Sequence, residues 1–308
     1  MPVPTPLTGV VPPVCTPLTP AREVDVPSLI RLLDHLLTGG VDALFVLGTT
    51  SEAAYLTDAQ RRLVVETATA HVAGAVPVLA GAIDMTTPRV LDHIRSATTA
   101  GADAVVVTAP FYTSTHPAEI ARHYRLLAAE SPVPVYAYDL PAGVHTKLGA
   151  DLILELAGEG VIAGLKDSSG DLANFRNVIT GTRSRPEFTT LTGSELTIDA
   201  ALAMGAHGSV PGLANIDPAG YVRLDRLCRA GDWDRARAEQ ERLCALFAMV
   251  TVGTPTRMGG SSSALGAFKA ALQLRGIIAC GATAEPQVPL SDAEIEQVGK
   301  YLAAAGLL

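Results

Sequence analysis

The sequence predicts a parallel (β/α)8 barrel (a TIM barrel, of the α/β class) with a C-terminal helical extension, and two observations carry this prediction. Eight short apolar segments alternate with helical patterns between residues 10 and 211. Strands that are apolar on both faces and are joined by helices form parallel sheets, and eight such units favour closure into a barrel over an open doubly wound sheet. After Pro218 the pattern is helical only.

The expected strands are Val10–Cys15, Ala43–Leu47, Val76–Ala80, Ala104–Thr108, Val135–Tyr138, Val161–Lys166, Phe188–Thr192 and Gly208–Pro211. The helices expected between them cover Val26–Thr38, Asp58–Val72, Pro88–Ala100, Pro117–Ser131, Ala150–Ala157, Leu172–Thr180 and Leu196–Met204. Thr57 is well placed to cap the helix that begins at Asp58. No GxGxxG follows the first strand, which weakens the dinucleotide-binding alternative.

The C-terminal part is expected to contain the helices Ala219–Ala230, Trp233–Val250, Ala264–Leu274 and Ser291–Ala304, with a Gly- and Ser-rich loop at Gly253–Ser263. No linker-like composition separates this part from the strands. We therefore predict a barrel over residues 1–216 and helices over residues 217–308 that pack on it.

Composition narrows the classes of function. Apolar residues make up 48% of the 308 residues and the net charge is −8, so no basic stripe is available to bind nucleic acid. No apolar run reaches the roughly 18 residues of a membrane span, and the proline-rich start is no signal peptide. The four cysteines lack metal-ligand spacing and suggest no disulfide framework. These features favour a reduced, cytoplasmic protein with no membrane partner.

Lysine is rare, which makes one lysine conspicuous. The 23 cationic residues include only Lys147, Lys166, Lys269 and Lys300 as lysines. Lys166 closes an apolar strand, and active sites of (β/α)8 barrels lie at the carboxyl ends of the strands. Partial desolvation there favours the uncharged amine, which can attack a carbonyl carbon. From position alone, a lysine paired with a carboxylate or reaching solvent is an open alternative.

Other polar residues end neighbouring strands. Tyr138 ends the strand before Lys166, and a phenol relayed by a hydroxyl can move the protons that imine formation requires. The Gly48–Ser51 segment would present backbone N–H groups and hydroxyls to a substrate carboxylate. Considered alone, Tyr138 is also consistent with a packing role, and the Gly48–Ser51 segment is also consistent with an ordinary strand-to-helix turn.

Taken together, these residues resemble the dihydrodipicolinate synthase/N-acetylneuraminate lyase family of class I aldolases, over essentially the whole chain. The motifs that carry the resemblance are GVVPPVCTPLT (9–19), GTTSEAAYLT (48–57), APFYT (109–113), YDLPAGV (138–144), GLKDSSG (164–170) and MGAHGSVPGLANIDP (204–218). Their order on an eight-unit barrel is more specific than any one of them.

The resemblance implies roles for particular residues. Lys166 matches the Schiff-base lysine, and Tyr138 matches the tyrosine that shuttles protons at the imine. Thr50 matches the residue that holds the pyruvate carboxylate, with Thr49 beside it in the proton relay. Tyr112 matches the tyrosine that reaches into the site of a partner subunit.

Three further residues complete the expected substrate site. The backbone of Val210 matches a residue that lines the pyruvate site, Ser168 is placed to donate to a substrate hydroxyl, and Gly48 opens the carboxylate cradle. The resemblance also implies a homotetramer built as a dimer of dimers, and a reaction that needs neither a metal nor an organic cofactor.

The sequence departs from the family at the second-substrate half of the site. Gly143 stands where the synthases carry the arginine that binds the aldehyde's carboxylate. Asp139 replaces an asparagine, and Ser51 replaces a glycine. After the seventh strand, Gly193-Ser194-Glu195-Leu196 stands where sialic acid lyases carry an Asp-Glu pair, which supports a polyhydroxy substrate only weakly.

These observations favour a pyruvate-dependent aldolase or lyase that acts on a 2-oxo-3-deoxy or 4-hydroxy-2-oxo acid, with a dehydratase outcome also open. One alternative is a 4-hydroxy-tetrahydrodipicolinate synthase, which joins pyruvate to aspartate semialdehyde, but Gly143 argues against it. A second alternative is a catalytically silent binding or regulatory barrel. Such a protein would be expected to lack the lysine, the tyrosine or the threonine, and all three are present.

Overall fold

The computed structural model describes residues 3–308 and contains a single sheet of eight parallel strands. The strands are β1 (Gly9–Val10), β2 (Leu44–Val46), β3 (Val78–Gly81), β4 (Ala104–Thr108), β5 (Val135–Asp139), β6 (Gly164–Asp167), β7 (Thr189–Thr192) and β8 (Gly208–Ser209). Their order is β1-β8-β7-β6-β5-β4-β3-β2. A bridge between Pro13 and Phe45 joins the two ends, with the Val14 N–H donating to the Phe45 carbonyl at 2.8 Å. The predicted barrel is therefore confirmed.

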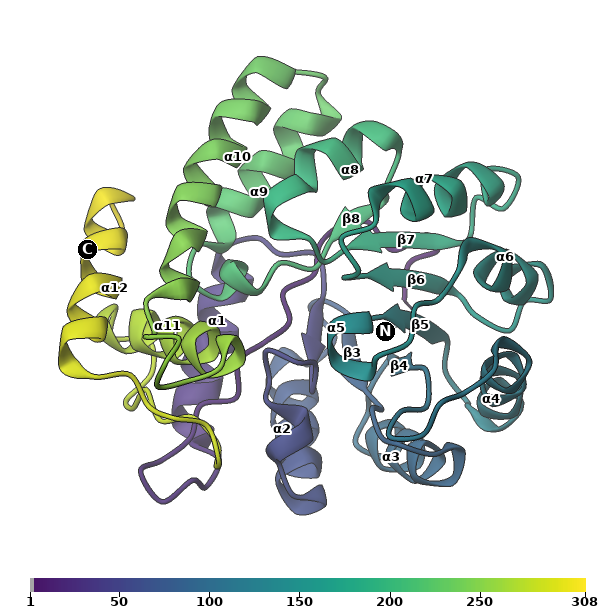
Figure 1. The fold of residues 1–308 in the computed structure, drawn as a ribbon, viewed down its shortest axis with the longest axis horizontal. Coiled ribbons are helices and arrows are strands. Elements are labelled where there is room, and N and C mark those ends of the chain that lie inside the picture. The colour runs from purple at the N-terminus through teal and green to yellow at the C-terminus, as the bar shows by residue number, and fades with distance from the viewer. Residues whose placement is uncertain (1–2) are drawn as a thin grey trace.

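Helices surround this sheet (Figure 1). Those of the barrel are α1 (Val26–Thr38), α2 (Asp58–Val72), α3 (Thr87–Thr99), α4 (Pro117–Glu130), α5 (Pro141–Val144), α6 (Ala150–Gly158), α7 (Leu172–Gly181) and α8 (Ile198–Met204). The later helices, gathered on one side, are α9 (Pro218–Arg229), α10 (Trp233–Phe247), α11 (Gly260–Leu274) and α12 (Asp292–Ala304). Short 3-10 turns are η1 (Ala53–Tyr55), η2 (Glu195–Thr197), η3 (Gly212–Asn215) and η4 (Ala248–Thr251).

Local sequence explains where α2 begins. The Thr57 side chain accepts a hydrogen bond from the Gln60 N–H, and the Gln60 side chain accepts one from the Thr57 N–H. This reciprocal capping box satisfies two backbone donors that the first helical turn leaves free. The predicted cap at Thr57 is confirmed, as are the bounds Asp58–Val72 and Val26–Thr38.

Two local predictions were wrong, and one short helix was not predicted. The first strand covers Gly9–Val10 and not Val10–Cys15, because Pro12 and Pro13 have no N–H to donate to a ladder. The loop expected at Gly253–Ser263 ends earlier, since α11 already begins at Gly260. The four-residue helix α5 was not expected, because its turn begins at a proline and contains a glycine.

The barrel interior is a separate hydrophobic cluster from the layer between the strands and the helices. Phe45, Tyr136 and Tyr138 belong to the inner cluster, whereas Ala137 and Leu165 belong to the outer one. Because side chains alternate along a strand, Lys166 follows Leu165 on the inner face. Strand β6 therefore delivers its lysine to the carboxyl end of the barrel interior.

A buried ion pair ties the C-terminal helices to the loop after β2. Glu52 is in the left-handed conformation with φ of 60° and is 1% exposed, and its carboxylate contacts the ammonium of Lys269 on α11. The Ala284 N–H donates to the Glu52 Oε1 atom at 2.6 Å, and Lys269 Nζ donates to the Ala282 carbonyl at 2.8 Å. The loop, α11 and the segment before α12 thus meet at one pair of charges.

We expect Lys269→Met to lower the free energy of unfolding by about 3–5 kcal/mol, because it leaves the Glu52 carboxylate buried without its cation. Urea unfolding followed by circular dichroism measures this change. Lys300→Met, which removes an exposed pair with Glu296, is the matched control and should change little. The double variant Glu52→Gln/Lys269→Met should lose less than Lys269→Met alone; a larger loss would contradict the argument.

Candidate active site

A cavity of about 590 Å³ lies at the carboxyl ends of the strands. Its lining includes seven residues predicted from the sequence as catalytic or substrate-binding: Gly48, Thr49, Thr50, Tyr138, Lys166, Ser168 and Val210. They come from β5, from β6 and from the loops after β2, β6 and β8. The fold therefore brings into one cavity residues that are far apart in the sequence.

Lys166 is held between a hydroxyl and an aromatic ring. Its Nζ atom donates to Ser168 Oγ at 2.9 Å and lies 3.5 Å from the centroid of the Tyr138 ring. The residue is 5% exposed, and none of the described carboxylates forms an ion pair with its amine. The alternative of a lysine paired with a carboxylate does not hold. Once it has lost a proton, an amine so placed can attack a carbonyl carbon in the cavity.

Gly193 makes room for this arrangement. A Cβ atom at this position would lie 2.1 Å from Ser168 Oγ and 3.3 Å from Lys166 Nζ. Any side chain at residue 193 would therefore displace Ser168 or the lysine amine. The Gly193 N–H also donates to the Asp167 carbonyl at 2.6 Å, which joins the loop after β7 to the end of β6.

Tyr138 lies beside the lysine because residues 138 and 166 are paired across β5 and β6. Its hydroxyl is 3.3 Å from Thr49 Oγ1. Burial by itself would raise the pKa of the Tyr138 phenol, but the charge of Lys166 and hydrogen bonds with Lys166, Thr49 and Ser168 lower the pKa below its usual range. A phenol so placed can pass protons to and from groups near the lysine amine.

The loop after β2 is strained on both sides of the threonines. Leu47 and Glu52 have φ values of 58° and 60°, in the left-handed region that side chains rarely adopt. The Ser51 hydroxyl donates to the Val14 carbonyl, and this contact holds the loop against the segment after β1. The replacement of the family glycine by Ser51 therefore adds an anchor to the loop that carries Thr49 and Thr50.

Tyr112 does not reach the cavity of its own chain. Its side chain is 89% exposed, and its backbone has a φ of 81°. Strain at an exposed aromatic residue is more typical of functional positions than of packing positions. Of the predicted catalytic residues, Tyr112 alone is absent from the cavity lining.

Two residues that sequence reasoning treated separately form one contact. Asp139 is fully buried, accepts a hydrogen bond from the Leu148 N–H at 3.0 Å and pairs with Lys147, whose Nζ also lies 3.9 Å from Asp167. Burial raises the pKa of Asp139, against the lowering effect of Lys147. The lysine in the loop after β5 thus compensates for the acid that replaces the family asparagine.

Glu195 also belongs to the site, although it is not among the site residues predicted from the sequence. This residue lines the cavity, and its Oε1 atom accepts a hydrogen bond from the Leu213 N–H at 3.1 Å. Burial raises the pKa of the carboxyl to about 7, while backbone N–H groups and the charge of Lys166 act in the opposite direction. The Ser194-Glu195-Leu196 sequence indicates this residue only weakly, because it has one acidic residue where sialic acid lyases carry an Asp-Glu pair.

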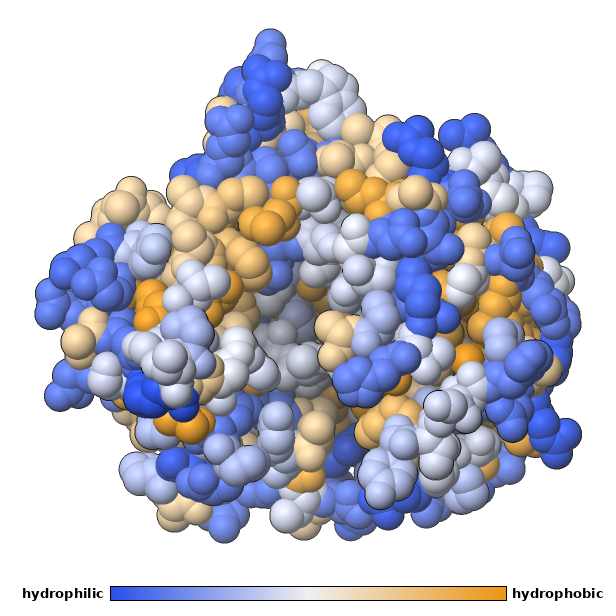
Figure 2. Space-filling model, viewed as in Figure 1, coloured by the Kyte–Doolittle hydropathy of each residue, from blue (hydrophilic) through white to orange (hydrophobic). Residues whose placement is uncertain are grey.

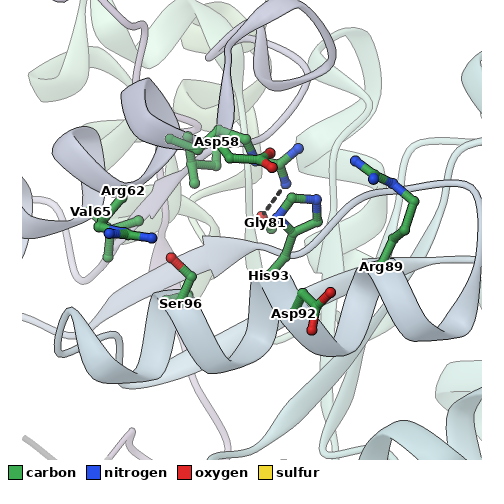
Figure 3. Close-up of a pocket in the computed structure, with 11 residues that line it drawn as sticks. Asp58, Arg62, Val65, Gly81, Arg89, Asp92, His93 and Ser96 are labelled. Atoms are coloured by element: carbon green, nitrogen blue, oxygen red, sulfur yellow. Dashed lines mark hydrogen bonds between the residues drawn. The ribbon is translucent and has the colours of Figure 1, made fainter.

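A second, smaller cavity lies between α2 and α3 and has different chemistry. Figure 3 shows Arg62 from α2 and Arg89 and His93 from α3 around it. Hydrogen bonds from Arg89 and His93 offset the effect of burial and lower the pKa of Asp84 to about 2. These groups tie α3 to the end of β3, and no predicted site residue lines this cavity. The cavity around Lys166 is therefore the candidate active site.

Comparison with known proteins shows the family of this chain. The model of the dihydrodipicolinate synthetase family matches residues 6–305. A DapA-like lyase of Halobacterium salinarum is 34% identical over 98% of this chain and 95% of its own length. A 4-hydroxy-tetrahydrodipicolinate synthase of Methanoculleus marisnigri is 31% identical over 96% of this chain and 98% of its own.

Two solved structures are similar over nearly the whole chain. YagE, a prophage protein of the dihydrodipicolinic acid synthase family from E. coli K12 solved in complex with pyruvate, has a TM-score of 0.90 and 29% identity, and the match covers 98% of this chain and 99% of YagE. The dihydrodipicolinate synthase of Bacteroides thetaiotaomicron has a TM-score of 0.91 and 32% identity, over 99% and 100% of the two chains.

The fold, the site and these relatives define a carbon–carbon lyase on a (β/α)8 barrel. The chain belongs to the dihydrodipicolinate synthetase family. The resemblance drawn from the sequence motifs is thus confirmed. Within residues 3–308, no helix is long and apolar enough to cross a membrane.

We expect the pKa of Tyr138 to rise in Lys166→Met, because the variant removes the charge that offsets the effect of burial. Ultraviolet difference titration measures it, with Tyr138→Phe subtracted to isolate this phenol from the other tyrosines. Lys300→Met, which alters a distant exposed lysine, is the control. An unchanged Tyr138 titration in Lys166→Met would show that the amine does not set the pKa of the phenol.

Proposed function

We propose that this lyase is a class I aldolase that forms a Schiff base between Lys166 and the keto group of pyruvate or a related 2-oxo acid. The observation that carries the proposal is the unpaired amine of Lys166, 2.9 Å from Ser168 Oγ and stacked on Tyr138 in a cavity. The relative YagE, solved with pyruvate, supports the same substrate.

Imine formation requires two proton transfers, and the site has groups for both. The Lys166 amine attacks the keto carbon, and the oxygen takes a proton to give a carbinolamine. Loss of that hydroxyl as water leaves the protonated imine. Tyr138, linked to Thr49 at 3.3 Å, is the donor that we assign to the departing hydroxyl. Thr50, Gly48 and the backbone of Val210 hold the pyruvate carboxylate in this assignment.

The imine then serves as the electron sink. In the cleavage direction, the C4 hydroxyl loses its proton and the C3–C4 bond breaks. The electron pair of that bond becomes the C2–C3 double bond of an enamine, and the π pair of the imine moves to the nitrogen. An aldehyde leaves, and protonation of the enamine followed by hydrolysis releases pyruvate. Because the protonated imine accepts the electrons, we propose that neither a metal nor an organic cofactor takes part.

A second candidate function is 4-hydroxy-tetrahydrodipicolinate synthesis, which several relatives carry in their names. It shares the imine with pyruvate and differs in the aldehyde, aspartate semialdehyde. Gly143 offers no guanidinium for the carboxylate of that aldehyde. We therefore rank the synthase below an aldolase that acts on a 2-oxo-3-deoxy or 4-hydroxy-2-oxo acid.

The role that we propose for Tyr112 depends on the assembly of several copies of this chain. Its exposure and positive φ support a role in the site of a neighbouring subunit, as the family resemblance implies. We propose that the chain forms a homotetramer, as a dimer of dimers in which paired chains exchange Tyr112 to complete the relay of Tyr138 and Thr49.

We expect borohydride reduction in the presence of pyruvate to attach a reduced pyruvyl group to Lys166, because borohydride reduces imines to stable amines. Peptide mass spectrometry locates the adduct. Lys166→Arg should abolish it, since a guanidinium is always protonated, whereas Lys300→Arg should retain it. Tyr138→Phe should slow turnover by about 10²–10⁴-fold, the usual contribution of a positioned acid–base group. An adduct on another lysine, or none, would overturn the proposed function.

We expect two poorly active variants, Lys166→Ala and Tyr112→Phe, to regain activity when they are mixed and reassembled. A hybrid dimer contains one site with the native lysine from one chain and the native Tyr112 from the other. Pyruvate release after unfolding and refolding the mixture measures the recovery. Separate refolding of each variant is the control. No recovery despite hybrid formation, seen by native mass spectrometry, would show that Tyr112 acts within its own chain or not at all.

A further inference from the structure

The cavity around Lys166 is lined by residues of two kinds, polar and apolar. The polar half comprises the polar groups of the loop after β2, of Tyr138 and of Ser168. We call the large apolar lining residues the apolar half, to which Ser261 of α11 adds one hydroxyl; they are Phe111, Leu140, Phe247, Val250, Leu265 and Phe268. If pyruvate occupies the polar half, the apolar half remains for the group attached to the second carbonyl compound.

The apolar half is built mainly by the C-terminal helices. Phe247 ends α10, Val250 lies in η4, and Phe268 lies in α11. Figure 2 shows a hollow at the centre of the molecule with apolar surface beside it on the side of these helices. Leu265 and Phe268 are 5% and 4% exposed, so most of each side chain is packed against the protein. An apolar wall of this kind favours a ligand with little polar surface.

The charges around the cavity disfavour an anionic second substrate. Among the lining residues, Lys166 is the only lysine, arginine or histidine, and the imine would use its nitrogen. Glu52 is committed to Lys269, and Glu195 would repel a carboxylate once ionised. A carboxylate brought into the apolar half would lose its hydration without gaining a cation, which is strongly unfavourable.

No cation stands at the position of the missing arginine. A Cβ atom at Gly143 would lie 2.9 Å from the Cδ2 atom of Leu140. The end of the Leu140 side chain would have to shift to admit a side chain at residue 143. Leu140, which precedes α5, and Ala142 and Val144 of α5 line the cavity, and none of their side chains carries a positive charge.

Glu195 gives the second carbonyl compound one polar partner. Its carboxyl group is fixed by the Leu213 N–H, and Gln240 Nε2 donates to its backbone carbonyl at 2.8 Å. The groups that face it are Lys166 from β6 and Tyr221 from α9. A protonated carboxyl here can donate to a carbonyl oxygen, and its conjugate base can accept the proton of the resulting hydroxyl.

We propose that the second substrate is an uncharged aldehyde with an aryl or alkyl group, which lies against the apolar half while its oxygen faces Glu195. This inference rests on the proposed function. In the synthetic direction the enamine carbon of pyruvyl-Lys166 attacks the aldehyde carbon and forms the C–C bond. The C=O π pair goes to oxygen, which takes the proton of Glu195. The enamine becomes an imine again, and water releases a 4-hydroxy-2-oxo acid.

The test is a panel of aldehydes supplied with pyruvate to the full-length protein: benzaldehyde, hexanal, D-glyceraldehyde and aspartate semialdehyde. Formation of the 4-hydroxy-2-oxo acid, or of the cyclised product in the last case, gives kcat/KM. We expect benzaldehyde or hexanal to exceed the other two by at least about tenfold, because apolar pockets discriminate by about 10–200-fold. A higher kcat/KM for D-glyceraldehyde or aspartate semialdehyde would overturn the proposal.

A matched pair of variants tests the wall itself. Val250→Thr adds a hydroxyl to the apolar half with little change in volume, and Val252→Thr makes the same change just outside the cavity lining. We expect Val250→Thr to lower kcat/KM for the preferred apolar aldehyde by about 3–10-fold, with the rate of pyruvyl adduct formation unchanged. Val252→Thr should leave both unchanged. Equal effects of the two variants would contradict the assigned wall.

Failure of this inference can be told from failure of the proposed function. If borohydride traps the pyruvyl group on Lys166 but neither apolar aldehyde is consumed, the substrate class is wrong and the Schiff-base chemistry stands. If no adduct forms on Lys166, the proposed function is wrong and the inference falls with it. Glu195→Gln should lower turnover of the preferred aldehyde without preventing the adduct; unchanged turnover would remove Glu195 from the proposed step.

Discussion

The ion pair between Glu52 and Lys269 is the contact through which the two parts of the molecule share one site. It lies where almost no solvent reaches, and it joins the loop after β2 to α11. The residue before Lys269 is Phe268, which faces the cavity. One turn of one helix therefore fixes the threonine loop and supplies part of the opposite wall. Movement of α11 would change both at once.

Strand alternation sets the rest of the geometry. Residues 138 and 166 are paired in adjacent strands, so a phenol and an amine on the same inner face must lie side by side. Phe45 lies next to them, with its ring centroid 5.8 Å from Lys166 Nζ and 6.3 Å from the Tyr138 ring centroid. A shift of β6 by one residue would turn its lysine to the helical layer. The site thus depends on strand register before any side-chain contact.

The sequence was sufficient for the elements and for the residues that end strands. Apolar runs and the Thr57 cap gave most bounds to within a few residues, and the position of Lys166 after an apolar strand indicated the cavity. Contacts between segments that are far apart in the chain could not be predicted from the sequence. Nothing in the helical pattern around Lys269 names Glu52 as its partner, and nothing in Phe247 or Phe268 shows which face meets the cavity. Those contacts depend on how helices pack, which local periodicity does not determine.

The cavity wall and the lysine have separate origins in the chain. The lysine and its partners come from strands and the loops that follow them, whereas Phe247, Val250 and Phe268 belong to a stretch that contributes nothing to the sheet. Evolution can therefore vary that stretch without disturbing the reactive amine, provided that Lys269 is kept. Such an arrangement allows a lineage to explore new substrates by substitutions within one segment. It also offers protein engineers a segment to randomise or exchange among relatives while the chemistry is preserved.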